Sequence, residues 1–461
     1  MSPLLIGISG YVLFQLAIVF FVARRVRSES DYLLAGRRFG TGLATFTIFA
    51  TWFGAETCIG AAGQVYGGGL SDSTADPFGY AACLLLLGFV FAAPLWRRKL
   101  TTLADLFRNR YSPGVEKFAV LLLVPTSLMW AAAQIRALGQ VISASSTFDV
   151  ELAIGIAAGF VIVYTVYGGL MANAITDLVQ GITVMIGLVV LLCAVVTAAG
   201  GIESSVAAID PERLRLFGGP ETPWWEVAER WAIPIFGSVI AQELISVILA
   251  SHTPQVARRG ALLGGSLYLL FGLIPVFIGL VGVSLLPGLE EPEQLLPLIA
   301  QKYLATLPYI LFVGAMTSAI LSTVAGALLA AAALLSHNLI VPLRPAMDNR
   351  AKVRIARASV VAGGLLAYLL ARHAGGVYEL VEQASAFGSS GVFTVVAFGL
   401  FTRRGHVRAA YTALATGVVT WTICHYVLDL PIAYLLSLGM AILAYLSVSF
   451  TEHPAPRHAL E

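Results

Sequence analysis

Two hydroxyl side chains, Ser322 and Thr323, stand next to each other in a long apolar stretch of this 461-residue chain. A helix that is broken elsewhere leaves backbone carbonyl groups free, and about five neutral oxygens suit a hard monovalent cation. A structural interpretation competes with this one, because a hydroxyl in an apolar helix often donates to the carbonyl one turn back. The residues alone leave both interpretations open.

Ionisable side chains inside apolar stretches form a second group of candidates: Glu56, Arg136, Asp177, Glu243 and Glu382. A charge at the centre of a membrane helix costs about 2.5 to 3.5 kcal/mol on insertion scales, so each should face protein or water. Asp177 is protonated, paired or part of an ion exit path. Arg136 either binds a substrate carboxylate or neutralises one of the glutamates.

The composition places these groups in a membrane protein. Hydrophobic residues make up 58% of the chain and charged residues 12%, with a mean hydropathy of +0.84. A formal net charge of +2 provides no strong field for nucleic acid. The seven histidines form no metal or nucleophile motif, so we expect neither enzyme activity nor a cofactor. The cysteines show no disulfide or zinc spacing, and we interpret them as small core residues: Cys58, Cys83, Cys193 and Cys424.

Apolar stretches of roughly twenty residues, bounded by charges or turns, predict about thirteen transmembrane helices. The first stretch lacks the basic start and the cleavage site of a signal peptide, so it is kept as a helix. The predicted ranges are 4–23, 41–70, 78–96, 118–142, 151–168, 175–199, 231–250, 261–286, 307–335, 355–371, 378–401, 409–428 and 431–450.

The distribution of basic residues predicts the orientation. Most of the 28 Lys and Arg residues fall in loops on one side of the membrane. By the positive-inside rule, the amino terminus then lies outside a plasma membrane, and the carboxyl-terminal tail, 451–461, is cytoplasmic.

This count of helices also predicts an internal symmetry. Two five-helix repeats, 41–199 and 231–401, would begin on opposite sides of the membrane, with one leading helix (4–23) and two trailing helices (409–450). In transporters with inverted repeats, the first helix of each repeat is broken near the midplane. The 41–70 stretch contains six glycines between Gly54 and Gly69, which weaken a continuous helix. The break in 231–250 is predicted mainly by symmetry, near Pro234 and Gly237.

Four blocks of sequence resemble the sodium/solute symporter family, which includes sodium-coupled sugar, proline, sialic acid and choline transporters. They are SESDYLLAGRR at 28–38, TTLADLFRNRYS at 101–112, YTVYGGLMANAITDLVQ at 164–180 and AILST at 319–323. The resemblance covers nearly the whole chain and implies an all-α, LeuT-type membrane fold. It also implies a symporter that couples sodium entry to import of a small polar solute by alternating access. A proton-coupled symporter of the same fold is the alternative, ahead of a channel or a transporter-like sensor.

The resemblance also implies how sodium binds. By the family pattern, one ion is held by three backbone carbonyls and two hydroxyls, those of Ala50, Phe53, Ala319, Ser322 and Thr323. Relatives with a second sodium ion use the acid matching Asp177 together with oxygens one turn beyond Thr323. Here Ala325 and Gly326 stand at those positions and supply no side-chain oxygen.

The substrate positions follow from the same resemblance. Glu56 and Thr57 match substrate contacts of the family's sugar transporters, whereas the early spans are nearest to its choline transporters, in which matching aromatic residues enclose a quaternary ammonium. Two further aromatic positions are replaced here by Ala241 and Val381. We expect the solute to be an amine, zwitterion, sugar or carboxylate. Its candidate contacts are Trp52, Glu56, Thr57, Tyr80, Trp130 and Arg136.

Overall fold

A computed structural model describes residues 3–24, 26–144, 148–344, 346–374 and 376–451, so nearly all of the predicted tail, 451–461, lies outside the described residues. The described chain is helical, with one isolated bridge between Phe39 and Ser251 and no strand. The α-helices of its first part are α1 (Pro3–Ala23), α2 (Glu29–Leu34), α3 (Thr41–Trp52), α4 (Ala61–Gly68), α5 (Tyr80–Leu86), α6 (Ala92–Arg97), α7 (Ala104–Arg110), α8 (Pro113–Ala144), α9 (Val150–Ala198) and α10 (Ile202–Ala207).

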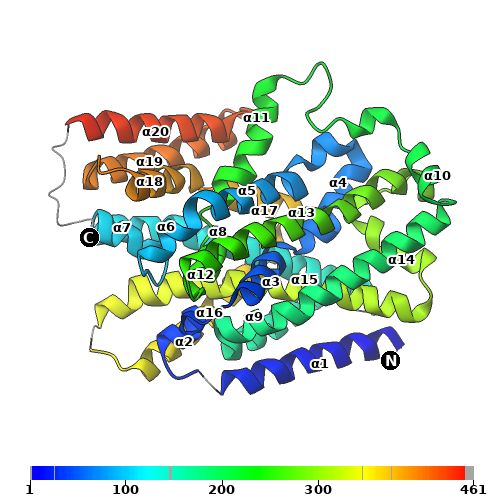
Figure 1. Ribbon diagram of the computed structural model, residues 1–461, viewed down its shortest axis with the longest axis horizontal. Helices are drawn as coiled ribbons and strands as arrows, with labels where there is room; N and C mark the ends of the chain where they lie inside the picture. Colours follow the sequence, from blue (N-terminus) through cyan, green and yellow to red (C-terminus); the bar gives the residue numbers. More distant parts are fainter. Residues whose placement is uncertain (1–2, 25, 145–147, 345, 375, 452–461) are drawn as a thin grey trace.

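The second part of the chain continues the same architecture. Its α-helices are α11 (Trp224–Ala232), α12 (Gln242–Ala250), α13 (Pro254–Leu285), α14 (Leu295–Tyr303), α15 (Thr306–Ala333), α16 (Asn349–His373), α17 (Val377–Ala386), α18 (Ser389–Phe401), α19 (Val407–Thr422) and α20 (Ala433–Thr451). The axes of most of the long helices are roughly aligned with one another (Figure 1). We call the end with the start of α1, α10 and α14 the N-terminal end, and the end with α2 and α7 the opposite end.

Helix α15 forms the centre of the bundle. Every residue from Phe312 to Ala333 is buried, and the helix packs mainly against α9 and α8. Ser322 and Thr323 lie within this buried segment. The element that carries the predicted ion-binding hydroxyls is therefore surrounded by protein, away from lipid.

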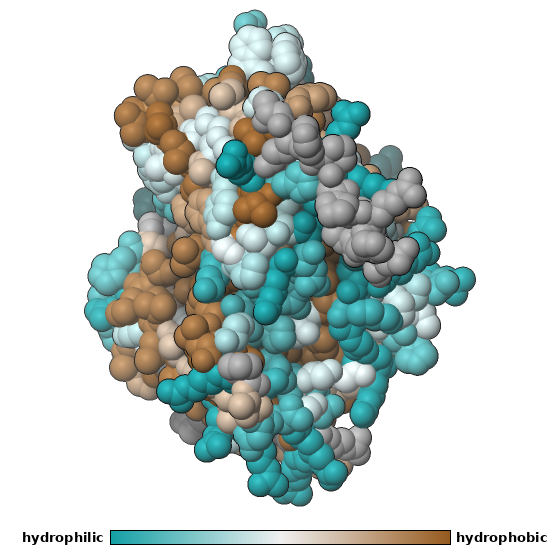
Figure 2. Space-filling model, turned by 90° about the vertical axis from the view of Figure 1, so that its left-hand side faces the viewer, coloured by the Kyte–Doolittle hydropathy of each residue, from teal (hydrophilic) through white to brown (hydrophobic). Residues whose placement is uncertain are grey.

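The described helices include membrane-spanning candidates by length and composition. Seven are long and apolar enough to cross a membrane, and two bent pairs pass the same criterion together. Large apolar side chains are exposed on the sides of the bundle, as on α9, α13 and α16: Ile186, Leu270 and Leu369. Figure 2, which looks onto the opposite end, shows hydrophilic residues over the centre and hydrophobic residues along the left edge. This pattern suits contact with lipid at the sides of the bundle and with water at its end. The count of thirteen transmembrane helices stays a prediction.

Both helix breaks predicted for the first helix of each repeat are present. The 41–70 stretch divides at Phe53 and Gly54 into α3 and, after the π-helical turn η2 (Glu56–Gly60), α4. The 231–250 stretch divides between η7 (Ile233–Gly237) and α12, with a bend of 42°. A third break, which the sequence did not predict, bends α17 and α18 by 41°.

The predicted spans 151–168 and 175–199 are separated at Gly169, where two helices meet at a kink, and the connection is shorter than the 169–174 left between the predicted spans. Helix α9 continues through this region and is interrupted only at Gly169, whose φ of 61° and ψ of 177° are not helical. Glycine has no Cβ, so the chain can turn there without a loop. The Tyr32 hydroxyl contacts the carbonyls of Thr165 and Val166, both at 3.2 Å, and satisfies backbone acceptors next to the interruption.

Contacts between segments close the opposite end of the bundle. The Arg37 guanidinium donates to the carbonyls of Leu100 at 2.7 Å, Lys99 at 3.0 Å and Leu249 at 3.4 Å. Trp96 Nε1 donates to the carbonyl of Ser251 at 2.7 Å. These bonds join the segment before α3 to the ends of α6 and α12.

Replacing Gly169 with alanine should destabilise the fold. A Cβ there would lie 2.8 Å from Tyr32 Cδ2 and 3.0 Å from the Tyr32 carbonyl oxygen, in a backbone conformation that side chains rarely adopt. We expect a loss of about 1 to 3 kcal/mol, measured as a lower melting temperature in detergent. Gly159→Ala in the same helix is the control, because its Cβ would meet open space. Equal melting temperatures for the two variants would contradict this account.

Candidate functional site

The break after α3 frees a backbone carbonyl inside the bundle. The Gly54 N–H donates to the carbonyl of Trp52 at 3.1 Å, so it does not serve as the helical donor for the carbonyl of Ala50. Phe53 ends the helix with a ψ of 76°, which is outside the helical range. The Ala50 carbonyl instead lies 3.3 Å from Thr323 Oγ1 on α15. Two of the predicted sodium ligands, Ala50 and Thr323, therefore lie together at the junction of α3 and α15.

Thr323 also connects this junction to its own helix. Its Oγ1 lies 3.1 Å from the carbonyl oxygen of Ala319, one turn back, and all three groups are buried. A hydroxyl has one hydrogen to donate and two lone pairs that accept. The carbonyl oxygens of Ala50 and Ala319 therefore converge on Thr323 Oγ1, and the contact with Ala319 is the one that the structural interpretation of this hydroxyl predicts.

Ser322 points to Asp177 on α9. Its Oγ donates to Asp177 Oδ1 at 2.5 Å, and Asn173 Nδ2 donates to Asp177 Oδ2 at 3.1 Å. All three side chains are buried, and no ion pair joins Asp177 to a base among the described residues. A hydroxyl that donates to a carboxylate keeps its lone pairs for a cation. Asp177 is thus placed to orient Ser322.

Gly54 is the point at which the predicted ion and substrate residues meet. A Cβ at this position would lie 2.7 Å from Thr323 Oγ1, 2.8 Å from Glu56 Oε2 and 2.8 Å from Gln134 Oε1. Gln134 accepts from the Ala55 N–H at 2.9 Å and donates to Glu56 Oε2 at 2.6 Å. The sequence analysis missed Gln134, although its position one turn after Trp130 in an apolar stretch was a usable signal.

Thr57 lies deeper than expected for a substrate contact. It is fully buried, and its Oγ1 donates to Asp76 Oδ2 at 2.8 Å and lies 2.8 Å from the Tyr268 hydroxyl oxygen. Asp76 is also fully buried, and the sequence analysis missed it because it precedes the predicted 78–96 span. Two carboxylates, those of Glu56 and Asp76, are therefore connected through neighbouring residues of η2.

The three aromatic candidates lie together. Ring centroids are 4.8 Å apart for Trp52 and Trp130, 5.8 Å for Tyr80 and Trp130, and 6.1 Å for Trp52 and Tyr80. The rings contact one another directly, and the Tyr80 hydroxyl lies 3.1 Å from Ser385 Oγ. In this conformation they form a packed cluster with no space for a ligand between them.

A cavity of about 250 Å³ lies next to this cluster and is lined by both Glu56 and Tyr80. Neither Trp52 nor Trp130 lines it. Its other lining residues include polar and charged side chains from both halves of the chain: Gln64, Ser71, Asp72, Thr74, Arg230, Tyr378 and Glu382.

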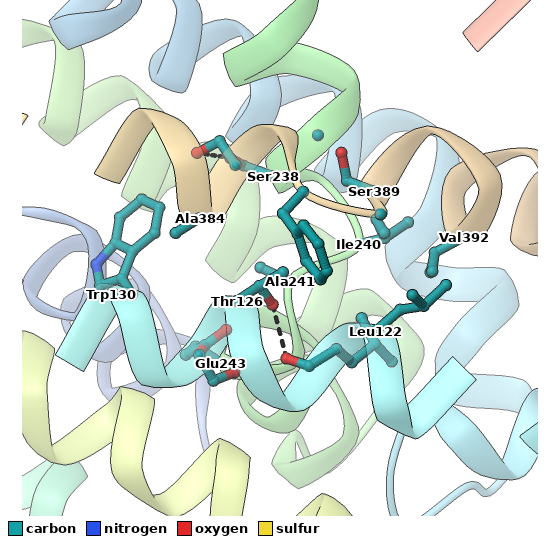
Figure 3. Close-up of a pocket in the computed structure, with 16 residues that line it drawn as sticks. Leu122, Thr126, Trp130, Ser238, Ile240, Ala241, Glu243, Ala384, Ser389 and Val392 are labelled. Carbon is teal, nitrogen blue, oxygen red and sulfur yellow. Dashed lines mark hydrogen bonds between the residues drawn. The ribbon is translucent and has the colours of Figure 1, made fainter. Parts of the chain in front are cut away.

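A smaller cavity of about 20 Å³ touches the other side of Trp130. Figure 3 shows Trp130 and Thr126 on α8, facing Ser238 and Ala241 from the break before α12 and Ser389 from the start of α18. Two of the three helix breaks therefore meet at α8. Of the positions where relatives carry further aromatic residues, Ala241 lines this cavity and Val381 lines the larger one.

Arg136 lies apart from the other substrate candidates. Its Nη1 donates to the carbonyl of Ala371 at 3.1 Å, and it lines a separate cavity of about 550 Å³ together with Glu291 and Glu293. Burial raises the pKa of Glu293, and the positive charge of Arg136 acts in the opposite direction. The base thus faces an acid in the segment before α14, away from Glu56.

Broken helices, freed carbonyls and buried hydroxyls at the centre of a membrane bundle are features typical of secondary transporters. The model of the Sodium:solute symporter family matches residues 32–417. The chain belongs to this family, and its long apolar helices make it a multi-pass membrane protein.

Known relatives cover most of the chain. It is 27% identical over 376 residues to the high-affinity choline transporter 1 of Caenorhabditis elegans, which covers 77% of this chain and 64% of that protein. It is 27% identical over 435 residues to the sodium/pantothenate symporter of Escherichia coli (strain K12), with 88% of each chain covered. The chain thus spans slightly less than two thirds of the choline transporter's length.

Solved structures confirm the LeuT-type fold. The substrate-bound, outward-open state of a Na⁺-coupled sialic acid symporter superimposes with a TM-score of 0.86 at 15% identity, covering 98% of each chain. The closed conformation of Mhp1, a nucleobase-cation-symport-1 family transporter, gives a TM-score of 0.63 at 16% identity, covering 94% of this chain and 98% of that one.

Gly54→Ala should weaken sodium binding, because its methyl group would overlap Thr323 Oγ1. We expect roughly tenfold weaker binding, equal to about 1.4 kcal/mol, measured as the sodium concentration that half-maximally raises the melting temperature. Gly67→Ala, whose Cβ would meet open space, is the control. Unchanged sodium dependence in Gly54→Ala would show that this junction is not the ion site.

Proposed function

We propose that this protein imports a small polar organic solute across the plasma membrane and that one coupling sodium ion binds between α3 and α15. The observation that carries the proposal is the convergence of Thr323 Oγ1 with the carbonyl oxygens of Ala50 and Ala319 at the α3 break. The Phe53 carbonyl and the Ser322 hydroxyl complete a set of five oxygens. Asp177 acts indirectly, by holding Ser322.

The sodium gradient supplies enough free energy for accumulation of the solute. One sodium ion crossing about −100 mV gains about 2.3 kcal/mol. A roughly tenfold concentration gradient adds about 1.4 kcal/mol. Together these terms support accumulation on the order of 500-fold at one sodium ion per solute.

The charge of the 250 Å³ cavity favours a cationic or zwitterionic amine as the solute. Three acids line it, Glu56, Asp72 and Glu382, against one base, Arg230. Tyr80 connects the cavity to the aromatic cluster, which provides ring faces that attract cations. The names of the relatives do not decide this point, because they include transporters of choline and of pantothenate.

The proposed orientation places this cavity toward the exterior. Its lining comes from α4 and the segment after it, from the end of α11 and from the first part of α17. The bonds of Arg37 and Trp96 close the opposite end, which we propose to be cytoplasmic. Solute and sodium would then enter from outside, before these contacts separate.

Removing either hydroxyl from α15 should raise the sodium requirement of uptake. For Ser322→Ala and Thr323→Ala in proteoliposomes, we expect the sodium concentration at half-maximal uptake to increase roughly tenfold, from about 1.4 kcal/mol of lost ion binding. Ser318→Ala is a matched control on the same helix, because Ser318 Oγ donates to the carbonyl of Gly314. If uptake by wild type runs equally well on a proton gradient without sodium, the ion assignment is wrong.

Truncating the aromatic cluster should weaken binding of an amine solute. For Tyr80→Ala, which removes the one ring of the cluster that lines the cavity, we expect roughly 2-fold to 30-fold weaker binding, from the loss of about 0.5 to 2 kcal/mol, and a smaller effect for Tyr80→Phe. The solute would first be found in a thermal-shift screen of metabolites with and without sodium. A sugar or carboxylate whose binding depends on Arg136 would contradict the amine proposal.

A further inference from the structure

Glu56 and Asp76 form a buried acidic pair that the sodium site does not use. Glu56 is 1% exposed and Asp76 is 0% exposed. Each carboxylate has one oxygen held by a neighbour, Glu56 Oε2 by Gln134 and Asp76 Oδ2 by Thr57. The other oxygens, Glu56 Oε1 and Asp76 Oδ1, are buried without a hydrogen-bond partner among the described residues.

No positive side chain compensates this pair. Among the described residues, no ion pair joins Glu56 or Asp76 to a lysine, arginine or histidine. Thr57, which follows Glu56 in the chain, donates to Asp76, so a single residue connects the two carboxylates. Burying unpaired charge is strongly unfavourable, so each carboxylate either takes up a proton or meets a positive charge from outside the chain.

The atoms around the pair suit a singly charged group. The Thr57 hydroxyl donates to Asp76, and the Tyr268 hydroxyl lies next to that of Thr57. The atoms that could coordinate a cation beside Asp76 are therefore all oxygens. Within the described part of the chain, no group of three or more His, Cys, Asp or Glu side chains is arranged to hold a metal ion. Carboxylate and hydroxyl oxygens suit a hard cation, and in a family of sodium:solute symporters the cation to test first is a monovalent one.

We propose that Glu56 and Asp76 together bind one monovalent cationic group, separate from the site at Ser322 and Thr323. The group is either a second sodium ion or the ammonium head of the solute. Glu56 lines the 250 Å³ cavity, and Asp76 is connected to it through Thr57, the residue after Glu56. This inference rests on the proposed function, because the group arrives through the proposed solute cavity.

The first experiment counts sodium ions by equilibrium binding of radioactive sodium to the purified protein. If the occupant is sodium, wild type binds two ions per chain and Glu56→Gln and Asp76→Asn each bind one. Asp72→Asn is the control, since Asp72 lines the same cavity but is about half exposed and pairs with Arg230 at 3.6 Å. Two isosteric variants, checked by size-exclusion chromatography, keep the test valid if one of them fails to fold.

The second experiment tests the ammonium head. With sodium at saturation, methylammonium should raise the melting temperature of wild type but not of Glu56→Gln or Asp76→Asn. Tetramethylammonium is the matched probe, because it carries the same charge without an N–H to donate to the two free carboxylate oxygens. If wild type binds one sodium ion per chain and shows this methylammonium effect, the occupant is the ammonium group of the solute.

One sodium ion per wild-type chain together with no methylammonium effect would overturn the proposal. Binding of two sodium ions per chain by both variants, Glu56→Gln and Asp76→Asn, would also overturn the proposal. Ser322→Ala separates this result from the proposed function. If Ser322→Ala leaves the ion count unchanged while Glu56→Gln lowers it, the sodium site at α15 is wrong and the acidic pair stands.

Discussion

The break in α3 is the constraint on which the central structure depends. Backbone groups inside a membrane protein need partners, because no bulk water is available to satisfy them. At Gly54 the N–H bonds to Trp52, and the Ala50 carbonyl is satisfied by Thr323 from another helix. This exchange requires a residue without a side chain at position 54 and a hydroxyl on α15 at the same depth. Burial of α15 on all sides follows from that requirement.

The sequence predicted this region well because its signals are local. Adjacent hydroxyls in an apolar run and a cluster of glycines are visible without knowledge of the fold, and they mark α15 and the α3 break. The family resemblance added the partner carbonyls of Ala50 and Ala319, which no side-chain pattern reveals. The convergence of Trp52, Tyr80 and Trp130 was predicted in the same way, but their direct packing against each other was not.

Features that depend on contacts between distant segments were missed. Asp76 stands just before an apolar stretch, where a polar residue usually marks a loop, and only its bond to Thr57 shows that it is buried in the core. The turn at Gly169 needs no loop because Tyr32, far away in sequence, satisfies the adjacent carbonyls. Arg136 faces Glu293, more than 150 residues away, and no local pattern indicates this pairing.

One break serves both of the proposed binding regions. Gly54 lies between Thr323, on the side of the sodium site, and Glu56, which lines the solute cavity, and Gln134 bonds to both Ala55 and Glu56. A ligand that fixes the backbone at this break therefore changes the position of groups on both sides of it. Such coupling is reciprocal, because an ion that strengthens solute binding is itself bound more tightly when the solute is present. Symport requires this property, and in the proposed function η2 and the end of α3 are the residues through which the two regions would be coupled.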